Sequence, residues 1–152
     1  MDRCIAVYKN KRYKAYSTGT KGEISKVKLF LHRAEEGFIP VMSAYDKDLY
    51  EKEIKKEEVS ELYREYFMAR YKNYEFFVVA HFMDRKEIEI VTVDPNIGRE
   101  CNLNYQDRDL FTKRLGSDDD FQLIHVKEDL LSKSTTRKEV TLEEPYVIDN
   151  EK

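Results

Sequence analysis

Histidines are the first residues to consider for catalysis, because an imidazole can act as a general base near neutral pH. The chain has three of them, His32, His81 and His125, each on or beside a predicted strand. If residues 84–86 form a three-residue turn, His81 faces Glu89 across the two strands that the turn joins. Such a pair suits a general base, but it is also an ordinary cross-strand contact. A small hydrolase that uses His81 or His125 with a nearby carboxylate is therefore one alternative.

Motifs for metals, phosphates and cofactors are missing or incomplete. No two histidines have the spacing of a zinc site, and Cys-x-x-Cys does not occur. Residues 118–120 are three consecutive aspartates, whereas a calcium loop needs oxygen ligands at alternate positions. Segment 19–22 looks like the end of a phosphate loop, but Ala15 stands where the first glycine would be. The sequence therefore predicts no catalytic residue, no metal site and no cofactor.

Charge is strongly sorted along the chain. Residues 1–33 contain nine Lys or Arg and two acidic residues, a net charge of +7. Residues 34–152 contain 18 basic and 28 acidic residues, a net charge of −10. If this sorting also holds on the surface, the protein has a basic patch and an acidic face, and both would steer charged partners.

The basic segment interleaves cations with aromatic rings on a predicted β-hairpin, with strands at 4–8 and 12–18 and a polar turn at 9–11. Nucleic-acid surfaces use this mixture, because cations release counterions from phosphates and rings stack on exposed bases. The plainer interpretation is an edge hairpin that lysines protect from aggregation. The residues of this candidate nucleic-acid site are Lys9, Lys11, Arg12, Tyr13, Lys14 and Tyr16.

Acidic residues gather between positions 46 and 65, where several lysines partly neutralise them. The ordinary interpretation is the solvated face of a helix. The functional interpretation is a surface that imitates a polyanion and docks onto a basic protein, because complementary charge gives fast association and partner choice. The residues of this candidate partner-binding face are Asp46, Asp48, Glu51, Glu57, Glu58, Glu61 and Glu65.

The hydrophobic pattern predicts an α+β fold in which a mostly antiparallel sheet of about five to seven strands carries helices on one face. The main amphipathic helix is expected at about 57–72, and one or two short helices, including one at 108–115, are expected to pack on the sheet. The apolar stripe of the main helix recurs at helical spacing, at Val59, Leu62, Tyr63, Tyr66 and Phe67.

Further strands are expected at 26–32, 75–83, 87–93 and 121–126. A short strand is also expected to contain Cys101, Leu103 and Tyr105, which alternate along the chain. The pattern indicates a single domain over residues 1–152, with a loosely ordered tail at 133–152.

Composition excludes several classes of protein. Aromatic residues make up 12% of the chain, too many for a disordered segment, and charged residues make up 38%. The longest uncharged apolar run, 76–83, is far shorter than the roughly 20 residues of a membrane-spanning helix. The N-terminal apolar stretch is too short for a signal peptide, and two cysteines cannot build a disulfide framework. These features predict a cytoplasmic protein with no membrane partner.

The leading hypothesis is a non-enzymatic binding protein of the immunity or inhibitor type, which neutralises a partner protein through its charged surface. A basic toxin or a nucleic-acid-handling enzyme is the expected kind of partner. The alternatives are a nucleic-acid-binding accessory protein that uses the basic hairpin and the small hydrolase described above.

Overall fold

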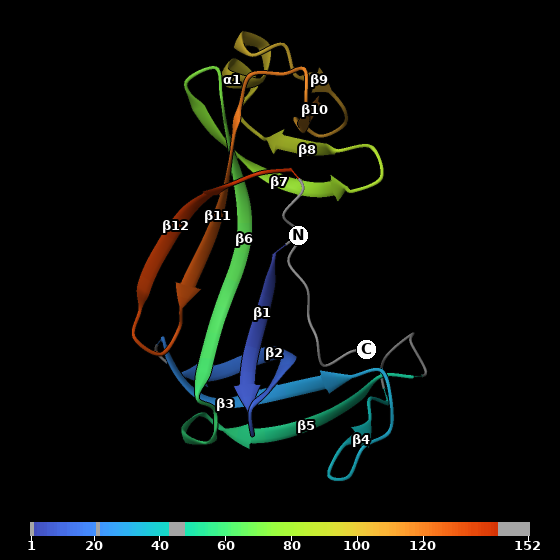
Figure 1. Ribbon diagram of the computed structural model, residues 1–152, viewed down its shortest axis with the longest axis vertical. Helices are drawn as coiled ribbons and strands as arrows, with labels where there is room; N and C mark the ends of the chain where they lie inside the picture. The colour runs from blue at the N-terminus through green and yellow to red at the C-terminus, as the bar shows by residue number, and fades with distance from the viewer. Residues whose placement is uncertain (1, 21, 43–47, 143–152) are drawn as a thin grey trace. The chain divides into compact units, whose positions relative to one another are not determined.

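The computed structural model describes residues 2–20, 22–42 and 48–142 (Figure 1). Of these residues, 61% lie in β-strands and 7% in helical turns. They form two compact units, which are described separately. The N-terminal unit contains Arg3–Arg64 and Glu128–Ser134, and the C-terminal unit contains Asp2, Glu65–Lys127 and residues 135–142.

The N-terminal unit is an antiparallel meander in which neighbouring strands in the order β1, β2, β3, β5 and β4 are hydrogen-bonded. A single 3-10 turn, η1 (Lys56–Glu58), follows β5. The strands of this unit are β1 (Arg3–Tyr8), β2 (Lys11–Thr20), β3 (Glu23–Leu31), β4 (Ile39–Pro40) and β5 (Tyr50–Lys55).

The predicted N-terminal hairpin is confirmed. Lys9 and Asn10 connect β1 to β2 with φ values of 50° and 65°, the left-handed conformation that a tight two-residue hairpin turn requires. The third predicted strand, 26–32, is also confirmed as β3. One side of this meander is apolar, and it packs into a core of Ala6, Tyr8, Tyr13, Val27, Leu29, Leu31, Ile54, Val59 and Leu62.

Two long strands, β6 (Glu61–Tyr71) and β11 (Gln122–Asp129), belong to both units, and β11 pairs with β6. β12 (Ser134–Val140) pairs with β11. The other strands of the C-terminal unit are β7 (Tyr74–Phe82), β8 (Glu87–Thr92), β9 (Asn104–Tyr105) and β10 (Phe111–Gly116). They pair antiparallel in the order β6, β7, β8, β10 and β9.

The core of the C-terminal unit lies under this sheet and beneath the short helix α1 (Pro95–Glu100). Its members include Phe67, Tyr71, Phe76, Ile88, Ile90, Phe111 and Leu115. The strands predicted at 75–83, 87–93 and 121–126 are confirmed as β7, β8 and β11.

The predicted α+β class and its main helix are wrong. Residues 57–72 form the end of η1 and then β6, and the described residues contain twelve strands rather than five to seven. Leu62, Phe67, Ala69 and Tyr71 are buried, and the last three follow the two-residue period of a strand. Glu65 is also buried at this two-residue period, so a charged residue occurs among the apolar residues on the inward side of β6.

The expected short helix at 108–115 is also wrong, because that segment is mostly the strand β10. The only α-helix among the described residues is α1, which begins at Pro95 after an Asp94 cap. The Asp94 carboxylate accepts hydrogen bonds from the backbone N–H groups of Asn96 and Ile97. The strand expected around Cys101 is reduced to β9, because Cys101 itself ends the helix.

The predicted tail, 133–152, contains β12, and residues 143–152 lie outside the described part of the chain. A single domain over the whole chain stays a prediction. Among the helices of the described segments, none has the length and apolarity needed to cross a membrane.

Candidate nucleic-acid interface

Strands β2 and β3 separate an apolar side from a cationic side. Tyr13 on β2 and Val27, Leu29 and Leu31 on β3 are buried, and the residues between them point the other way. We call this opposite side the basic face. It consists of Arg12, Lys14 and Tyr16 on β2 and Lys26, Lys28 and Phe30 on β3.

The pairing of the two strands sets the pattern of the basic face. Lys14 lies opposite Phe30, and Tyr16 lies opposite Lys28. The two cations therefore occupy one diagonal of a four-residue block, and the two aromatic rings occupy the other. The Tyr16 side chain is 60% exposed, which is unusual for a large ring on a sheet.

Acidic residues of β5 mark one margin of the basic face. Glu51 lies opposite Phe30 and Glu53 lies opposite Lys28. The Lys26 ammonium is 3.7 Å from the Glu53 carboxylate, with both side chains more than half exposed. Lys55 lies opposite Lys26 and adds a further cation. Five cations and two carboxylates thus share this side of β2, β3 and β5, so positive charge is in excess.

Three of the six residues of the predicted nucleic-acid site lie together on the basic face, namely Arg12, Lys14 and Tyr16. Tyr13 points inward, where it is 4% exposed and stacks on Phe38 with 5.7 Å between ring centroids. Burial raises the pKa of the Tyr13 hydroxyl, and the nearby Glu35 carboxylate raises it further.

Lys9 and Lys11 belong to the turn end of the hairpin. The Lys9 ammonium lies 5.2 Å from the centroid of the Tyr8 ring, and the Lys11 ammonium is 3.5 Å from Glu35. The sequence interpretation missed the β3 residues of the basic face. Their signal was the alternation in 26–30, where Lys, Lys and Phe alternate with buried Val27 and Leu29.

The predicted acidic face is dispersed in the structure, because the helix that was expected to carry it is absent. Glu65 is buried, at 6% exposure. The Glu58 carboxylate accepts a hydrogen bond from the Lys55 backbone N–H at 2.8 Å. Glu51 lies on β5 beside the basic face, and Asp46 lies outside the described residues. The remaining members, Asp48, Glu57 and Glu61, are exposed and lie before β5, in η1 and at the start of β6.

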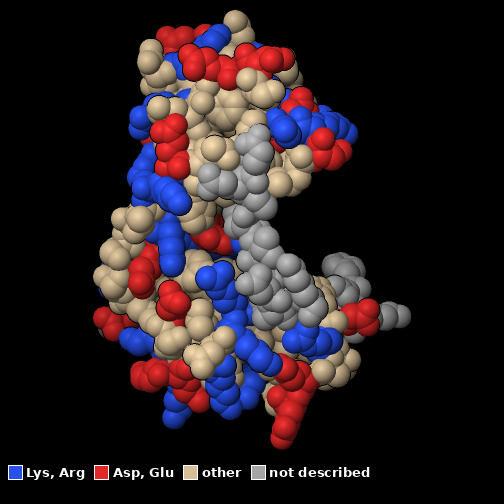
Figure 2. Space-filling view, viewed as in Figure 1, with Lys and Arg blue, Asp and Glu red and all other residues tan. Residues whose placement is uncertain are grey.

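The separation of basic from acidic residues along the chain is therefore reproduced on only part of the surface. Figure 2 shows Lys and Arg side chains next to Asp and Glu side chains in both units. On the side of the N-terminal meander formed by β2 and β3, the strand register combines several cations with the exposed ring of Tyr16 and the partly buried ring of Phe30.

The expected pairing of His81 with Glu89 is wrong. His81 lies opposite Ile88, and Glu89 lies opposite Ala80, because the turn has four residues, 83–86, and places Phe82 rather than Met83 opposite Glu87. The His81 Nε2 atom is instead 3.1 Å from the Leu142 carbonyl oxygen.

His125 does meet a carboxylate. Its Nε2 atom lies 2.9 Å from Glu65 Oε2, where the Glu65 side chain is only 8% exposed. The Phe67 ring lies beside His125, with 5.2 Å between ring centroids, and also beside His81, at 6.3 Å. Buried polar groups in proteins are normally hydrogen-bonded. The contact with the Glu65 carboxylate and the packing on Phe67 therefore account for His125 as a structural residue.

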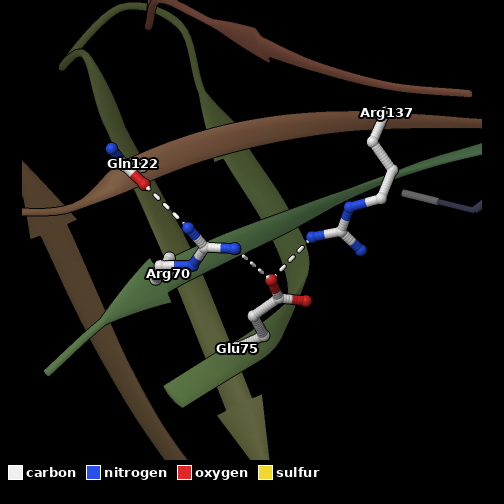
Figure 3. A network of polar contacts seen from close by, with 4 residues as sticks. All are labelled: Arg70, Glu75, Gln122 and Arg137. Atoms are coloured by element: carbon white, nitrogen blue, oxygen red, sulfur yellow. Dashed lines mark hydrogen bonds and ion pairs between the residues drawn. The ribbon is translucent and has the colours of Figure 1, made fainter. Parts of the chain in front are cut away.

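A second polar network in the C-terminal unit is centred on Glu75 (Figure 3). Glu75 Oε2 accepts hydrogen bonds from Arg137 at 2.6 Å and from Arg70 at 2.9 Å. Arg70 also donates to the Gln122 side-chain oxygen at 3.3 Å. The hydrogen bonds from Arg137 and Arg70 lower the pKa of Glu75 below its usual range. Because this carboxylate neutralises part of the arginine charge, the network joins β6, β7, β11 and β12 rather than presenting an anion site.

Among the hollows lined by described residues are two that include no histidine. One, of about 200 Å³, lies in the N-terminal unit between Ile24, Lys56, Leu130 and Lys133. The other, of about 180 Å³, lies in the C-terminal unit beside Asp119, Gln122 and Leu142. Nowhere in the described ranges do three His, Cys, Asp or Glu side chains come together as a metal site requires.

The fold and the basic face define a small all-β protein, built from antiparallel meanders, with a cationic and aromatic side on one meander. The chain belongs to the family described as Uncharacterised conserved protein UCP033725, whose model matches residues 2–133 and so includes the whole basic face. No curated protein and no solved structure shows a significant match to the chain.

Proposed function

We propose that this protein binds nucleic acid by holding the phosphate backbone against the basic face. The observation that carries the proposal is the register of β2 and β3, which places Arg12, Lys14, Lys26 and Lys28 on one side of the meander. A cationic sheet surface attracts a polyanion and gains free energy by releasing its condensed counterions.

The geometry favours this function over the two others that the sequence raised. Among the described acidic residues expected to bind a partner protein, Glu65 is buried and Glu51 lies beside the basic face, so the inhibitor-type function has less support and stays a prediction. The His125–Glu65 pair lines neither of the two hollows described above, so neither hollow supports the hydrolase alternative.

Salt dependence is the measurement that tests the proposal. Each cation that neutralises a phosphate should contribute roughly 0.7 to 0.9 to the slope of log affinity against log salt concentration. The double variant Lys14→Gln/Lys28→Gln is expected to bind an oligonucleotide more weakly at low salt. Its slope should be smaller than that of the unchanged protein by about 1.4 to 1.8, the contribution of two phosphate contacts.

The matched control is Lys113→Gln/Lys138→Gln, which changes the net charge by the same amount on strands β10 and β12 of the C-terminal unit. This control should bind with the affinity and slope of the unchanged protein. Equal losses in the two double variants, or no binding of any oligonucleotide at roughly 50 mM salt, would remove nucleic acid as the ligand.

A further inference from the structure

The aromatic rings of the basic face point to a particular kind of nucleic acid. In the same unit, other rings pack on each other, as Tyr8 does with Tyr13 at 6.4 Å and Tyr13 with Phe38 at 5.7 Å. Within the described residues, Tyr16 and Phe30 pack against no other aromatic ring; Tyr16 is 60% exposed, and Phe30 is partly buried with part of its ring open to solvent. A large apolar ring left in water beside cations is the arrangement that stacks on nucleobases.

We propose, on the basis of the function proposed above, that the ligand is a single strand of DNA or RNA whose bases stack on Tyr16 and Phe30. The two rings occupy diagonal positions on neighbouring antiparallel strands, about 7–8 Å apart. At that spacing each ring meets its own base. Lys14 and Lys28, on the opposite diagonal, lie where they neutralise the phosphates that join the two bases.

A duplex does not fit this arrangement. Its base faces are buried against each other, so it offers phosphates and groove edges but no ring surface for Tyr16 and Phe30. A wide duplex on the basic face would also bring phosphates toward Glu51 and Glu53 on β5, which repel them. A single strand that follows β2 and β3 meets the cations and rings and brings fewer phosphates near those carboxylates than a duplex does.

The test compares three ligands of equal length in one buffer: single-stranded oligo-dT, an abasic oligomer with the same phosphates, and a duplex. Oligo-dT should bind at least about five-fold more tightly than the abasic oligomer, since stacking on one ring has that effect or more. The chain contains no Trp and 11 Tyr, so binding is followed by fluorescence anisotropy of a labelled oligomer, not by intrinsic tryptophan signal.

Three variants assign the stacking to a residue. Tyr16→Leu is expected to weaken oligo-dT binding at least about five-fold while leaving the salt slope unchanged, because it removes a ring and no charge. Tyr16→Phe, which keeps the ring, should restore most of the affinity. Tyr105→Leu is the matched control, because Tyr105 on β9 is 61% exposed in the C-terminal unit, and it should bind like the unchanged protein.

The outcomes separate this inference from the proposed function. Equal binding of all three ligands, with a salt slope that still depends on Lys14 and Lys28, would overturn the single-strand inference and leave nucleic-acid binding intact. An unchanged affinity of Tyr16→Leu for oligo-dT would overturn it as well. Failure of every ligand to bind at low salt would overturn both proposals.

Discussion

At the scale of single residues, burial decides which charged groups are available for binding. Glu65 is the only charged side chain in the described segments that is buried, and it contacts His125 within the C-terminal unit. Its carboxylate is therefore held inside the protein and contributes little to any partner-binding surface. The cations of the basic face are at least partly exposed, so their charge reaches the solvent.

The pH dependence of stability should report on Glu75. Hydrogen bonds from Arg137 and Arg70 lower the pKa of this carboxyl in the folded protein. A depressed carboxyl pKa stabilises the fold at pH values above the unfolded pKa of about 4.3, and this contribution disappears as pH falls through the lower folded value.

We therefore expect Glu75→Gln to lose about 1 kcal/mol of unfolding free energy at pH 7. The difference from the unchanged protein should shrink as the pH is lowered below the unfolded pKa of about 4.3. Urea denaturation at several pH values measures it. A difference that grows toward acid pH would contradict the assignment of the stabilising charge to Glu75.

At the scale of elements, α1 docks on β10 through a glycine. A Cβ atom at Gly98 would lie 2.5 Å from Phe111 Cγ, and the Phe111 ring is buried at 5% exposure. Gly98→Ala is therefore expected to cost about 1 to 3 kcal/mol through overpacking. Thermal denaturation followed by far-UV circular dichroism measures the loss.

The control for that experiment is Gly116→Ala on β10. Its added Cβ would make only an ordinary contact with Glu87 Cγ at 3.5 Å, and neither glycine has a positive φ. A variant at Gly98 as stable as the one at Gly116 would show that α1 can shift away from β10.

The elements also show what the sequence could and could not predict. The hairpin from β1 to β2 was predictable, because a polar turn separates two segments that fit strands and the register follows from it. The same Lys-Asn pair recurs at Lys72 and Asn73, with φ values of 49° and 71°, and joins β6 to β7. That turn was the signal that 57–72 is not a helix.

The helical interpretation failed for a physical reason. A helical stripe fits the positions of Val59, Leu62, Tyr63, Tyr66 and Phe67. In the structure Leu62 and Tyr63 are both buried but lie on opposite sides of the strand, because Tyr63 packs on Ile5 of β1. A strand covered on both sides loses its two-residue alternation. For the candidate site, the sequence placed Arg12, Lys14 and Tyr16. The alternation in 26–30 indicated that Lys26, Lys28 and Phe30 share one side of a strand, and the register of β3 with β2 was needed to show that both sets lie on the same side.

At the scale of the whole molecule, a formal charge of −3 hides a local excess of positive charge. Residues 1–33 carry a net charge of +7, and β2 and β3 direct four of these cations to one side. Short-range attraction by such a group persists at moderate salt, whereas the field of the distant acids is screened beyond roughly 10 Å.

We therefore expect the protein to be retained on immobilised heparin at pH 7 in low salt, despite its acidic sequence pI of about 5.7. The Lys14→Gln/Lys28→Gln variant should elute at a lower salt concentration, and the Lys113→Gln/Lys138→Gln control should elute with the unchanged protein. Elution of all three proteins without retention would mean that repulsion of heparin by the net negative charge exceeds its attraction by the basic face.

The pairing order has a further consequence for behaviour at high concentration. The path of paired strands ends at β4 in the N-terminal unit and at β9 in the C-terminal unit, and each has only two residues. The longer outer strand β12, which pairs only with β11, carries Arg137 and Lys138. Short or charged edge strands offer a neighbouring molecule few unpaired backbone N–H and C=O groups. This arrangement disfavours fibril growth in a protein with this much β-structure.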